Sequence, residues 1–406
     1  MLVGGGPAPG INGVIAAATI EAIASGLSVV GLRQGYAHIA RGDLSQVMPL
    51  TVDDVTRAHF EGGSILGTSR TNPAKDAQTL RTVVDSLQKL GITHLVTIGG
   101  DDTSFGAAKI SQEAGGRIAV AAVPKTIDND LPLPDGIPTF GFETARAVGT
   151  RIVQTLLEDA RSTDHWYLVV SMGRNSGSLA LGIARSAGAT LALIPEEFPR
   201  GDVSLETIVT TVVGSIVKRK AHGYGYGVVV LAEGLIDRLS PADRDAMAAS
   251  LPKDAYGHIR LTDLPFGDDL RDSVRKRLDE IGVTATVVAK DLGYELRCAP
   301  PVPFDLEYTR TLGYGAVRYL LEGGSGALIT FNGERIVPLQ LAQLLDPKTG
   351  RIRVRSVDAG GEGYRIARRF MSRLESEDFQ GDRLRALAAH TKLEPEAFCA
   401  AFDAAV

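Results

Sequence analysis

Residues 94–130 read HLVTIGGDDTSFGAAKISQEAGGRIAVAAVPKTIDND. The runs HLVTI (94–98) and IAVAAV (118–123) are almost continuously apolar, which is typical of strands covered on both faces by helices. Between them, we expect a helix that starts at Thr103 and Ser104. A strand, a helix and a second strand in this order predict a parallel βαβ unit.

The same alternation extends in both directions along the chain. The runs YLVVS (167–171) and YGVVVL (226–231) are further predicted buried strands. Apolar residues at helical spacing predict a helix over 11–22, and residues 76–90 form a second amphipathic pattern that ends before Gly91. These elements favour an α/β fold with mostly parallel sheets.

Composition sets the class of protein. The chain has 406 residues, of which 44% are hydrophobic and 22% are charged, as in ordinary globular proteins, and this length suggests two domains. The formal charge of −5 provides no basic field for nucleic acid. No apolar run reaches the roughly 18 to 20 residues of a membrane span. We therefore expect neither a nucleic-acid partner nor a membrane partner.

Cysteine and histidine usage indicates no zinc site and no disulfide framework. Cys298 and Cys399 belong to no CxxC pair, and no HExxH motif is present. The amino-terminal residues do not resemble a secretory signal, so we expect a cytoplasmic protein. Only residues 1–3 precede GGG, so the first strand is very short or the natural chain starts further upstream.

Polar, glycine-rich residues follow all four predicted strands: GGDDTS, PKTIDND, MGRNSG and AEG. Ligands of open α/β sheets bind at the carboxyl ends of the strands. We therefore expect these four strand ends to form one site.

The segment GGDDTSFG (99–106) contains two adjacent carboxylates. Asp101 stands where a carboxylate can hold Mg²⁺ that bridges a polyphosphate. The alternative is that Asp101 or Asp102 only caps the following helix. One cap explains one of these aspartates, not both.

The segment PKTIDND (124–130) is the most informative. Asp128 and Asp130 bracket an asparagine, and Lys125 lies three residues before the first of them. An alcohol that attacks phosphorus needs a carboxylate to accept its proton, and the transferred phosphoryl group needs positive charge nearby. A turn alone explains Asp128 and Asn129 but leaves Lys125 and Asp130 without a reason.

Three other segments carry weaker signals. GGGPAPGIN (4–12) can bring backbone N–H groups to a phosphate or can be a tight turn. Arg70 in GGSILGTSRTNP (62–73) can bind phosphate bidentately or can be a surface arginine. Arg174 in MGRNSG suits a sugar phosphate, and Glu233 in AEG suits sugar hydroxyls or is simply solvated.

These segments, followed by GYELR (293–297), resemble the phosphofructokinase family in their order along the chain. The run CAPPVPFDLEYTRTLGYGAVRYLLEGG (298–324) and VRSVDAG (354–360) are similar to its pyrophosphate-dependent branch. The resemblance implies two Rossmann-like three-layer domains with interleaved chain segments. Residues 1–140 and about 295–350 would bind pyrophosphate and Mg²⁺. Residues from about 141 to 294 and 351–406 would bind fructose 6-phosphate, with a charged insertion at about 240–290.

The resemblance also implies roles for individual residues. Asp128 matches the general base for the 1-hydroxyl of the sugar, Asp130 supports it, and Asp101 matches the residue associated with Mg²⁺. Lys125 and Asp102 complete the implied catalytic set. The implied diphosphate contacts are Gly6, Arg70, Asp102, Thr103 and Lys125, and the implied fructose 6-phosphate contacts are Thr126, Asp128, Met172, Gly173, Arg174, Glu233, Tyr294 and Arg297.

The choice of phosphoryl donor depends on two positions. ATP-using members of the family usually have glycine in place of both Asp102 and Lys125. A carboxylate at 102 fills and negatively charges the space that an α-phosphate needs, and the ammonium of Lys125 stabilises pyrophosphate as it splits. Some members with the lysine use ATP, so Asp102 carries most of the prediction.

This sequence departs from the family pattern at three places. His165 and Val288 replace arginines that the family often has, and Tyr294 stands where ATP-using enzymes commonly have histidine. The predicted sugar-phosphate pocket is therefore the part most affected by these departures. The resemblance implies a homodimer or homotetramer.

Three alternatives remain at this stage. An ATP-dependent phosphofructokinase differs in donor alone. A lipid or NAD kinase shares a GGD loop but lacks PKTIDND and MGR. A catalytically silent subunit that binds sugar phosphate is disfavoured because all the polar catalytic positions are retained.

Overall fold

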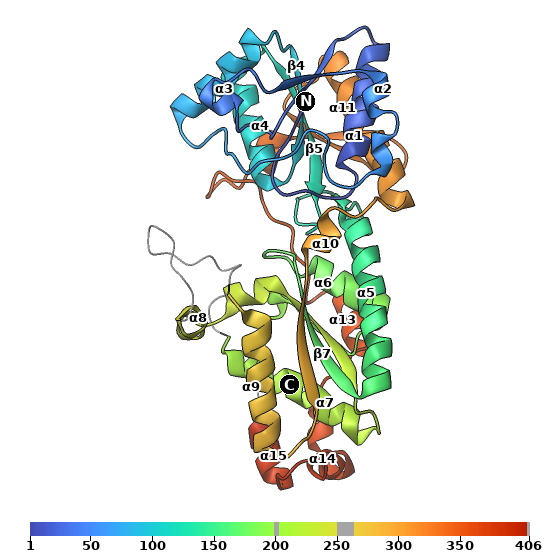
Figure 1. The fold of residues 1–406 in the computed structure, drawn as a ribbon. Coiled ribbons are helices and arrows are strands. Elements are labelled where there is room, and N and C mark those ends of the chain that lie inside the picture. Colours follow the sequence, from blue (N-terminus) through green and yellow to red (C-terminus); the bar gives the residue numbers. More distant parts are fainter. Residues whose placement is uncertain (199–202, 250–263, 404–406) are drawn as a thin grey trace. The chain divides into compact units, whose positions relative to one another are not determined.

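The computed structural model describes residues 1–198, 203–249 and 264–403, which are arranged in two units (Figure 1). Unit 1 consists of Met1–Ala147 and Tyr294–Arg355, and unit 2 consists of Val148–Gly293 and Ser356–Val406. The predicted α/β class with mostly parallel sheets is confirmed. The returning segment of unit 1 begins at Tyr294.

Unit 1 contains a six-stranded sheet of order β1-β4-β5-β11-β12, with β6 paired to β5. All pairs are parallel except β11 with β12. The strands are β1 (Leu2–Val3), β4 (His94–Gly99), β5 (Ala119–Thr126), β6 (Phe140–Gly141), β11 (Ala327–Phe331) and β12 (Ile336–Gln340), and β2 (Val29–Leu32) with β3 (Val47–Leu50) forms a separate antiparallel pair.

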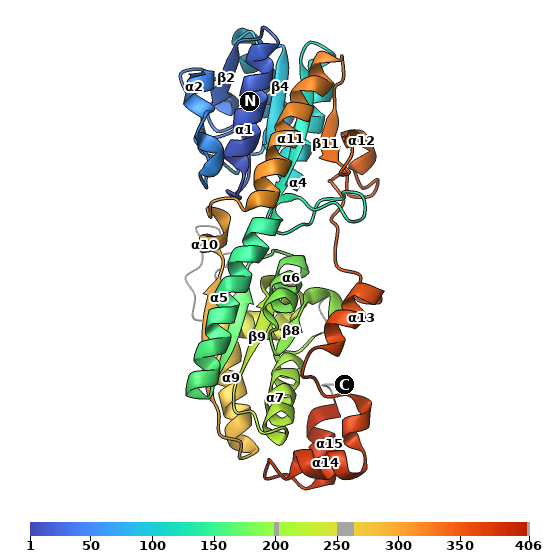
Figure 2. The ribbon, with the colours of Figure 1, turned by 90° about the vertical axis from the view of Figure 1, so that its right-hand side faces the viewer.

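Helices cover both faces of this sheet (Figures 1 and 2). Leu95 and Val120 point to the face packed by α3 and α4, whereas their neighbours Val96 and Ala121 point to the face packed by α1 and α11. This alternation explains why the strands read as continuous apolar runs. The helices are α1 (Ile11–Ala24), α2 (Val52–Val55), α3 (Ala77–Lys89), α4 (Asp101–Ala114), α10 (Tyr294–Arg297), α11 (Pro303–Leu321) and α12 (Leu341–Leu344), with short 3-10 turns η1 (Ile39–Arg41) and η2 (Ala58–Phe60).

Strand β5 extends beyond the apolar run that predicts it. Lys125 pairs with Phe140 and Thr126 pairs with Gly141, so β6 adds two rungs to the ladder. Lys125 is therefore a strand residue, 4% exposed, rather than part of the following loop. The strand fixes the position of its backbone.

A buried carboxylate holds the start of helix α5 (Phe142–Thr163). Asp305 of α11 is fully buried and accepts hydrogen bonds from the N–H of Gly141 at 2.9 Å and from the N–H and hydroxyl of Thr144 at 2.8 and 2.6 Å. Burial raises the pKa of Asp305, while these bonds oppose that shift. Asp305 therefore supplies, from a distant segment, the acceptor that a capping side chain usually provides.

Replacing Asp305 with alanine is expected to destabilise the protein by about 3 kcal/mol, because it leaves several buried donors without an acceptor. The midpoint of urea unfolding measures this effect. Glu307→Ala is the matched control, since Glu307 lies exposed on the same helix and its loss should shift the free energy of unfolding by less than about 0.5 kcal/mol. Equal midpoints for the two variants would rule out this role for Asp305.

Unit 2 contains a four-stranded parallel sheet of order β10-β7-β9-β8. Helices α7 and α9 contribute to the core on one face, and α6 packs against β7, β8 and β9. The strands are β7 (His165–Ser171), β8 (Leu191–Leu193), β9 (Gly227–Ala232) and β10 (Thr286–Leu292), and the helices are α5, α6 (Ser178–Ala187), α7 (Leu205–Ala221), α8 (Pro241–Ala248), α9 (Phe266–Glu280), α13 (Glu362–Arg369), α14 (Gly381–Ala388) and α15 (Pro395–Phe402), with 3-10 turns η3 (Pro195–Glu197), η4 (Glu233–Arg238) and η6 (Ser376–Phe379).

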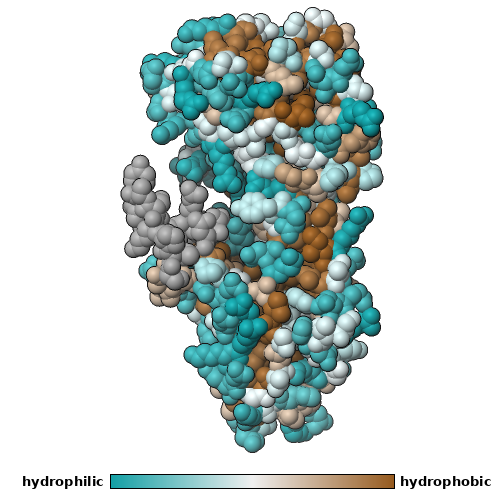
Figure 3. Space-filling view, in the orientation of Figure 1, coloured by the Kyte–Doolittle hydropathy of each residue, from teal (hydrophilic) through white to brown (hydrophobic). Residues whose placement is uncertain are grey.

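Part of the charged segment predicted as an insertion at about 240–290 contributes to the core of unit 2. Residues 250–263 lie outside the described residues, but α9 and β10 are integral elements. Leu270 and Val274 of α9 are buried, and β10 pairs with β7 along its whole length. The charges of α9 lie on its outer face, where Figure 3 shows a hydrophilic surface. The charged composition predicted an insertion because α9 is amphipathic, with charged residues on one face and buried apolar residues on the other.

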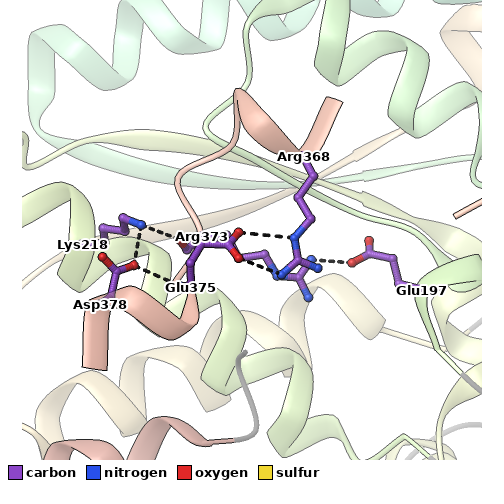
Figure 4. A network of polar contacts seen from close by, with 6 residues as sticks. All are labelled: Glu197, Lys218, Arg368, Arg373, Glu375 and Asp378. Atoms are coloured by element: carbon purple, nitrogen blue, oxygen red, sulfur yellow. Dashed lines mark hydrogen bonds and ion pairs between the residues drawn. The ribbon is translucent and has the colours of Figure 1, made fainter. Parts of the chain in front are cut away.

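Within unit 2, the carboxy-terminal segment packs against η3 and α7 through a polar network (Figure 4). Glu197 and Arg373 form an ion pair in which both side chains are less than 10% exposed. Lys218 of α7 donates to the carbonyl of Arg373 at 2.7 Å and to Asp378 at 2.5 Å. These bonds connect η3 and α7 to the residues that follow α13.

Among the helices that the structure describes, none combines the length and the apolar character that crossing a membrane requires.

Candidate active site

The loops after β4 and β5 lie at the same edge of the unit 1 sheet, because the two strands are adjacent and parallel. Helix α4 begins at Asp101, two residues earlier than expected, with Gly100 at its N-cap and no side-chain cap. Neither Asp101 nor Asp102 therefore occupies the N-cap position itself. Both carboxylates lie in the first turn, where the helix dipole stabilises negative charge.

Lys125 connects this edge to the glycine-rich segment after β1. Its Nζ donates to the carbonyl oxygen of Gly6 at 2.5 Å. Gly5 adopts the left-handed conformation (φ 81°), and a Cβ there would lie 3.2 Å from Nζ of Lys125. Glycine at position 5 thus permits both the turn and the approach of the ammonium.

The segment 62–73 is hydrogen-bonded to the same glycine-rich segment. The N–H of Gly5 donates to the carbonyl of Ser69 at 2.8 Å, and the hydroxyl of Thr68 donates to the carbonyl of Gly5 at 2.5 Å. Buried Asn12 also accepts from the N–H of Ile65 at 2.9 Å. Arg70, which is exposed, is therefore attached to the end of β1 through its neighbours.

Arg297 of α10 lies over Gly6. A Cβ on Gly6 would be only 2.0 Å from Nη2 of Arg297, and Nε of Arg297 donates to the carbonyl of Pro7 at 3.5 Å. Burial and then the positive charge of Arg70 lower the pKa of Arg297. Two guanidinium groups that repel each other at a glycine-rich edge form a place where an anion is stabilised.

Tyr294 and Asp128 complete the surroundings of Arg297. The guanidinium carbon lies 5.5 Å from the ring centroid of Tyr294, which is 78% exposed. The charge of Asp128 favours the protonated form of Arg297. The predicted residues Gly6, Arg70, Asp128, Tyr294 and Arg297 are thus neighbours within unit 1.

Gly6→Ala tests this arrangement. The added methyl group displaces the guanidinium of Arg297, which is the far end of a flexible side chain, so we expect little change in stability. The KM for at least one phosphate-bearing substrate should rise about tenfold, because one charge-assisted hydrogen bond contributes about 1.5–3 kcal/mol. Steady-state kinetics measures the effect. Gly363→Ala is the control because a Cβ there meets nothing within 4 Å, and an unchanged KM in Gly6→Ala would contradict this arrangement.

Asp128 and Asp130 are both buried, with exposed fractions of 6% and 7%. Asn129 between them adopts the left-handed conformation (φ 57°), which turns the chain sharply. The N–H of Asp128 donates to the hydroxyl of Thr126 at 3.0 Å. This contact gives the predicted ligand Thr126 a structural task at the site.

Thr103 has a packing role that the sequence did not indicate. Its side chain is 5% exposed and fits between two glycines, since a Cβ on Gly4 or on Gly99 would come within 2.3 Å of it. This close packing explains why both strand ends require glycine. The predicted diphosphate contact at Thr103 stays a prediction.

The remaining predicted residues lie in unit 2, after β7 and β9, which are also adjacent and parallel. Oε2 of Glu233 accepts from the N–H groups of Gly173 and Arg174 at 3.2 and 3.3 Å. Arg174 is exposed and left-handed (φ 49°). The N–H of Met172 donates to the carbonyl of Leu292 at 2.9 Å. Glu233 therefore shapes the MGRNSG loop as well as standing beside it.

The sequence analysis did not identify two residues that hold loops of the candidate site, one in each unit. Glu196 accepts from the N–H of Gly177 at 3.0 Å and from that of Val357 at 3.0 Å, and so holds the end of MGRNSG. Arg355 donates to the loop that contains Asp128. Arg355 lies inside the VRSVDAG run, but nothing in that run indicates its partners, which are more than 200 residues away.

Within the described residues, no three acidic, histidine or cysteine side chains come together to hold a metal ion. Asp101 at the start of α4 is compatible with Mg²⁺, which typically takes one or two protein carboxylates and completes its shell with phosphate oxygens and water.

Comparison with known proteins shows the family of this chain. Residues 1–320 match the sequence model described as Phosphofructokinase. The chain belongs to the phosphofructokinase family. A Naegleria fowleri relative named pyrophosphate–fructose 6-phosphate 1-phosphotransferase is 51% identical over 99% of this chain and 94% of its own length. A Thermotoga maritima relative of the same name is 49% identical over 98% of this chain and 96% of its own.

A solved phosphofructokinase fold also matches. The structure described as pyrophosphate-dependent phosphofructokinase from Marinobacter aquaeolei has a TM-score of 0.65, 19% identity and coverage of 92% of this chain and 91% of its own. The predicted family and its fold are therefore confirmed.

Proposed function

We propose that this chain is a pyrophosphate-dependent phosphofructokinase. It transfers a phosphoryl group from diphosphate to the 1-hydroxyl of fructose 6-phosphate and yields fructose 1,6-bisphosphate and phosphate. The main observation behind the proposal is the hydrogen bond from Lys125 to the carbonyl of Gly6 in the Gly4–Gly6 segment. This contact lies beside the end of β4, which is followed by Asp101 and Asp102. Relatives about half identical in sequence, which carry the name of this activity, support it.

The donor preference follows from the charges at this edge. Asp102 is exposed at the start of α4, where its carboxylate repels the additional phosphate of a nucleotide. The ammonium of Lys125 is held at the Gly6 carbonyl and stabilises the negative charge that develops as diphosphate splits. Arg70 and Arg297 add positive charge for the phosphate groups.

Asp128 accepts the proton of the attacking 1-hydroxyl. A general base of this kind must be fixed in position, and Asp128 lies in a buried turn next to Asn129. Asp130 lies two residues after Asp128 in the same segment, and its proposed role is to support Asp128 as the general base. One P–O bond breaks in diphosphate as another forms to the sugar oxygen, so the reaction is proposed to be readily reversible.

Mg²⁺ is the proposed metal, and Asp101 is its proposed protein ligand. When bound, the ion neutralises negative charge on the diphosphate oxygens. The proposed fructose 6-phosphate contacts are the predicted ones: Thr126, Asp128, Met172, Gly173, Arg174, Glu233, Tyr294 and Arg297.

The proposed compartment is the cytoplasm, and both cysteines are unpaired, as a reducing compartment favours. The family resemblance supports a homodimer or a homotetramer.

A coupled assay on the purified protein tests the function. Formation of fructose 1,6-bisphosphate is followed with diphosphate or ATP as donor at saturating fructose 6-phosphate and Mg²⁺. We expect kcat/KM for diphosphate to exceed that for ATP at least about 100-fold, which corresponds to about 2.7 kcal/mol. A preference for ATP would replace this proposal with the ATP-dependent alternative.

A further inference from the structure

We propose that Arg355 is a positioning residue that fixes residues 127–139 and thereby the orientation of Asp128. The inference rests on the proposed function, which makes Asp128 the general base. Arg355 is half-buried at the end of unit 1, outside the motifs to which the sequence analysis assigned roles.

Arg355 binds both ends of this segment. Its backbone N–H donates to the carbonyl of Asp130 at 2.7 Å, and its Nε donates to the carbonyl of Asn129 at 3.1 Å. Its Nη2 donates to Oδ1 of Asn129, and its Nη1 donates to the carbonyl of Ile137 at 2.8 Å. A longer contact of 3.5 Å reaches the carbonyl of Leu133. One side chain therefore joins the residue beside Asp128 to the far end of the loop.

The bonds continue from Asn129 to Asp128 itself. Oδ1 of Asn129 also accepts from the N–H of Thr139 at 3.0 Å. The hydroxyl of Thr139 donates to the carbonyl of Thr126 at 2.8 Å, and the hydroxyl of Thr126 accepts from the N–H of Asp128 at 3.0 Å. The amide that Arg355 holds is thus part of a closed chain of hydrogen bonds around the proposed base.

The segment needs such a support. No helix or strand occurs between Thr126 and Phe140, so its backbone has no regular ladder to hold it. Asn129 also keeps a left-handed conformation, which is unfavourable for a residue other than glycine. These side-chain bonds of Arg355 go to neutral carbonyl and amide oxygens, and their number suits the fixed fork of a guanidinium. An ammonium is a single point and cannot span these acceptors.

The first test compares Arg355→Lys with Arg353→Lys. Arg353 is the matched control because it lies two residues earlier, is exposed and donates to the carbonyl of Gln343 outside the loop. We expect Arg355→Lys to lower kcat about 10- to 100-fold, since a small displacement of a catalytic group costs this much, with KM for diphosphate changed less than about threefold. Arg353→Lys should keep kcat within about twofold. Equal kcat values for the two variants would overturn the proposal.

A double-mutant cycle then separates positioning from an independent effect. If Arg355 acts through Asp128, adding Arg355→Lys to Asp128→Asn should lower the residual kcat by less than about threefold. A purely structural role, or an independent contact with substrate, lowers the residual rate by as much as it lowers the wild-type rate. That additive outcome would overturn the proposal.

Hydrogen exchange provides a readout that needs no turnover. In Arg355→Lys, the amides of residues 127–139 should exchange faster, while those of strand β4 keep wild-type protection. Asn129→Gly is a second variant that removes the shared Oδ1 acceptor without losing the left-handed turn, and it should loosen the same segment and lower kcat. Unchanged exchange in both variants would overturn the proposal. If the wild-type protein uses ATP instead, the proposal of diphosphate as donor is wrong. The hydrogen-exchange results test the role of Arg355 independently of the donor.

Discussion

Asp128→Asn is expected to lower kcat by about 10³-fold, within the range of about 10²–10⁴ that general base catalysis contributes. The substitution keeps the size of the side chain and removes only its ability to accept a proton. KM for fructose 6-phosphate should change much less than kcat. Initial rates in the coupled assay measure both quantities.

Asp85→Asn is the control for this experiment, because Asp85 is an exposed aspartate of α3, outside the loop that contains Asp128. It should leave kcat within about twofold of wild type. If Asp128→Asn retained more than a tenth of the wild-type kcat, Asp128 would not be the general base.

The double substitution Asp102→Gly with Lys125→Gly is expected to abolish most turnover with diphosphate. Removing one preorganised charge from a site typically costs about 10²–10³ in kcat, and both members of the donor-selecting pair are lost here. The ratio of kcat/KM for ATP to that for diphosphate should rise, because the space beside the donor opens and loses its negative charge.

Lys125→Met separates the charge from the volume of the buried side chain, and it should lose most diphosphate activity without the cavity that glycine creates. Lys109→Met on α4 is its control, since Lys109 lies 5.4 Å from the ring centroid of Phe105 and is absent from the proposed site. An unchanged donor ratio in the double variant would remove residues 102 and 125 from donor selection.

The sequence predicted the main elements because burial on both faces leaves a clear signal. The apolar runs at 94–98 and 118–123 became β4 and β5, and the helix expected over 76–90 became α3, capped by Asp76. The length of β5 was underestimated because its last two residues depend on pairing with β6, a contact that no local pattern encodes.

The charged face of α9 made a packed helix resemble an insertion in the sequence. Asp268, Arg271 and Arg275 dominate the local composition, whereas Leu270 and Val274 decide the packing. The buried positions recur every four residues, so the helical period was present in the sequence and the charge density obscured it.

The candidate site was only partly predictable for a different reason. Residues at strand ends can be read from the sequence, because the sheet brings adjacent strand ends together. Arg355, Glu196 and Asp305 act on residues at least 19 positions away, through contacts that only the folded chain creates. No local sequence pattern predicts the long-range contacts of such supporting residues.

Binding of donor analogues tests the central claim most directly. Calorimetric titration of the wild-type protein with methylenediphosphonate and with a non-hydrolysable ATP analogue, both with Mg²⁺, compares two linked phosphates with three. The account predicts that the diphosphonate binds at least about 100-fold more tightly, a difference of about 2.7 kcal/mol. Nucleotide binding as tight as that of the diphosphonate would contradict it.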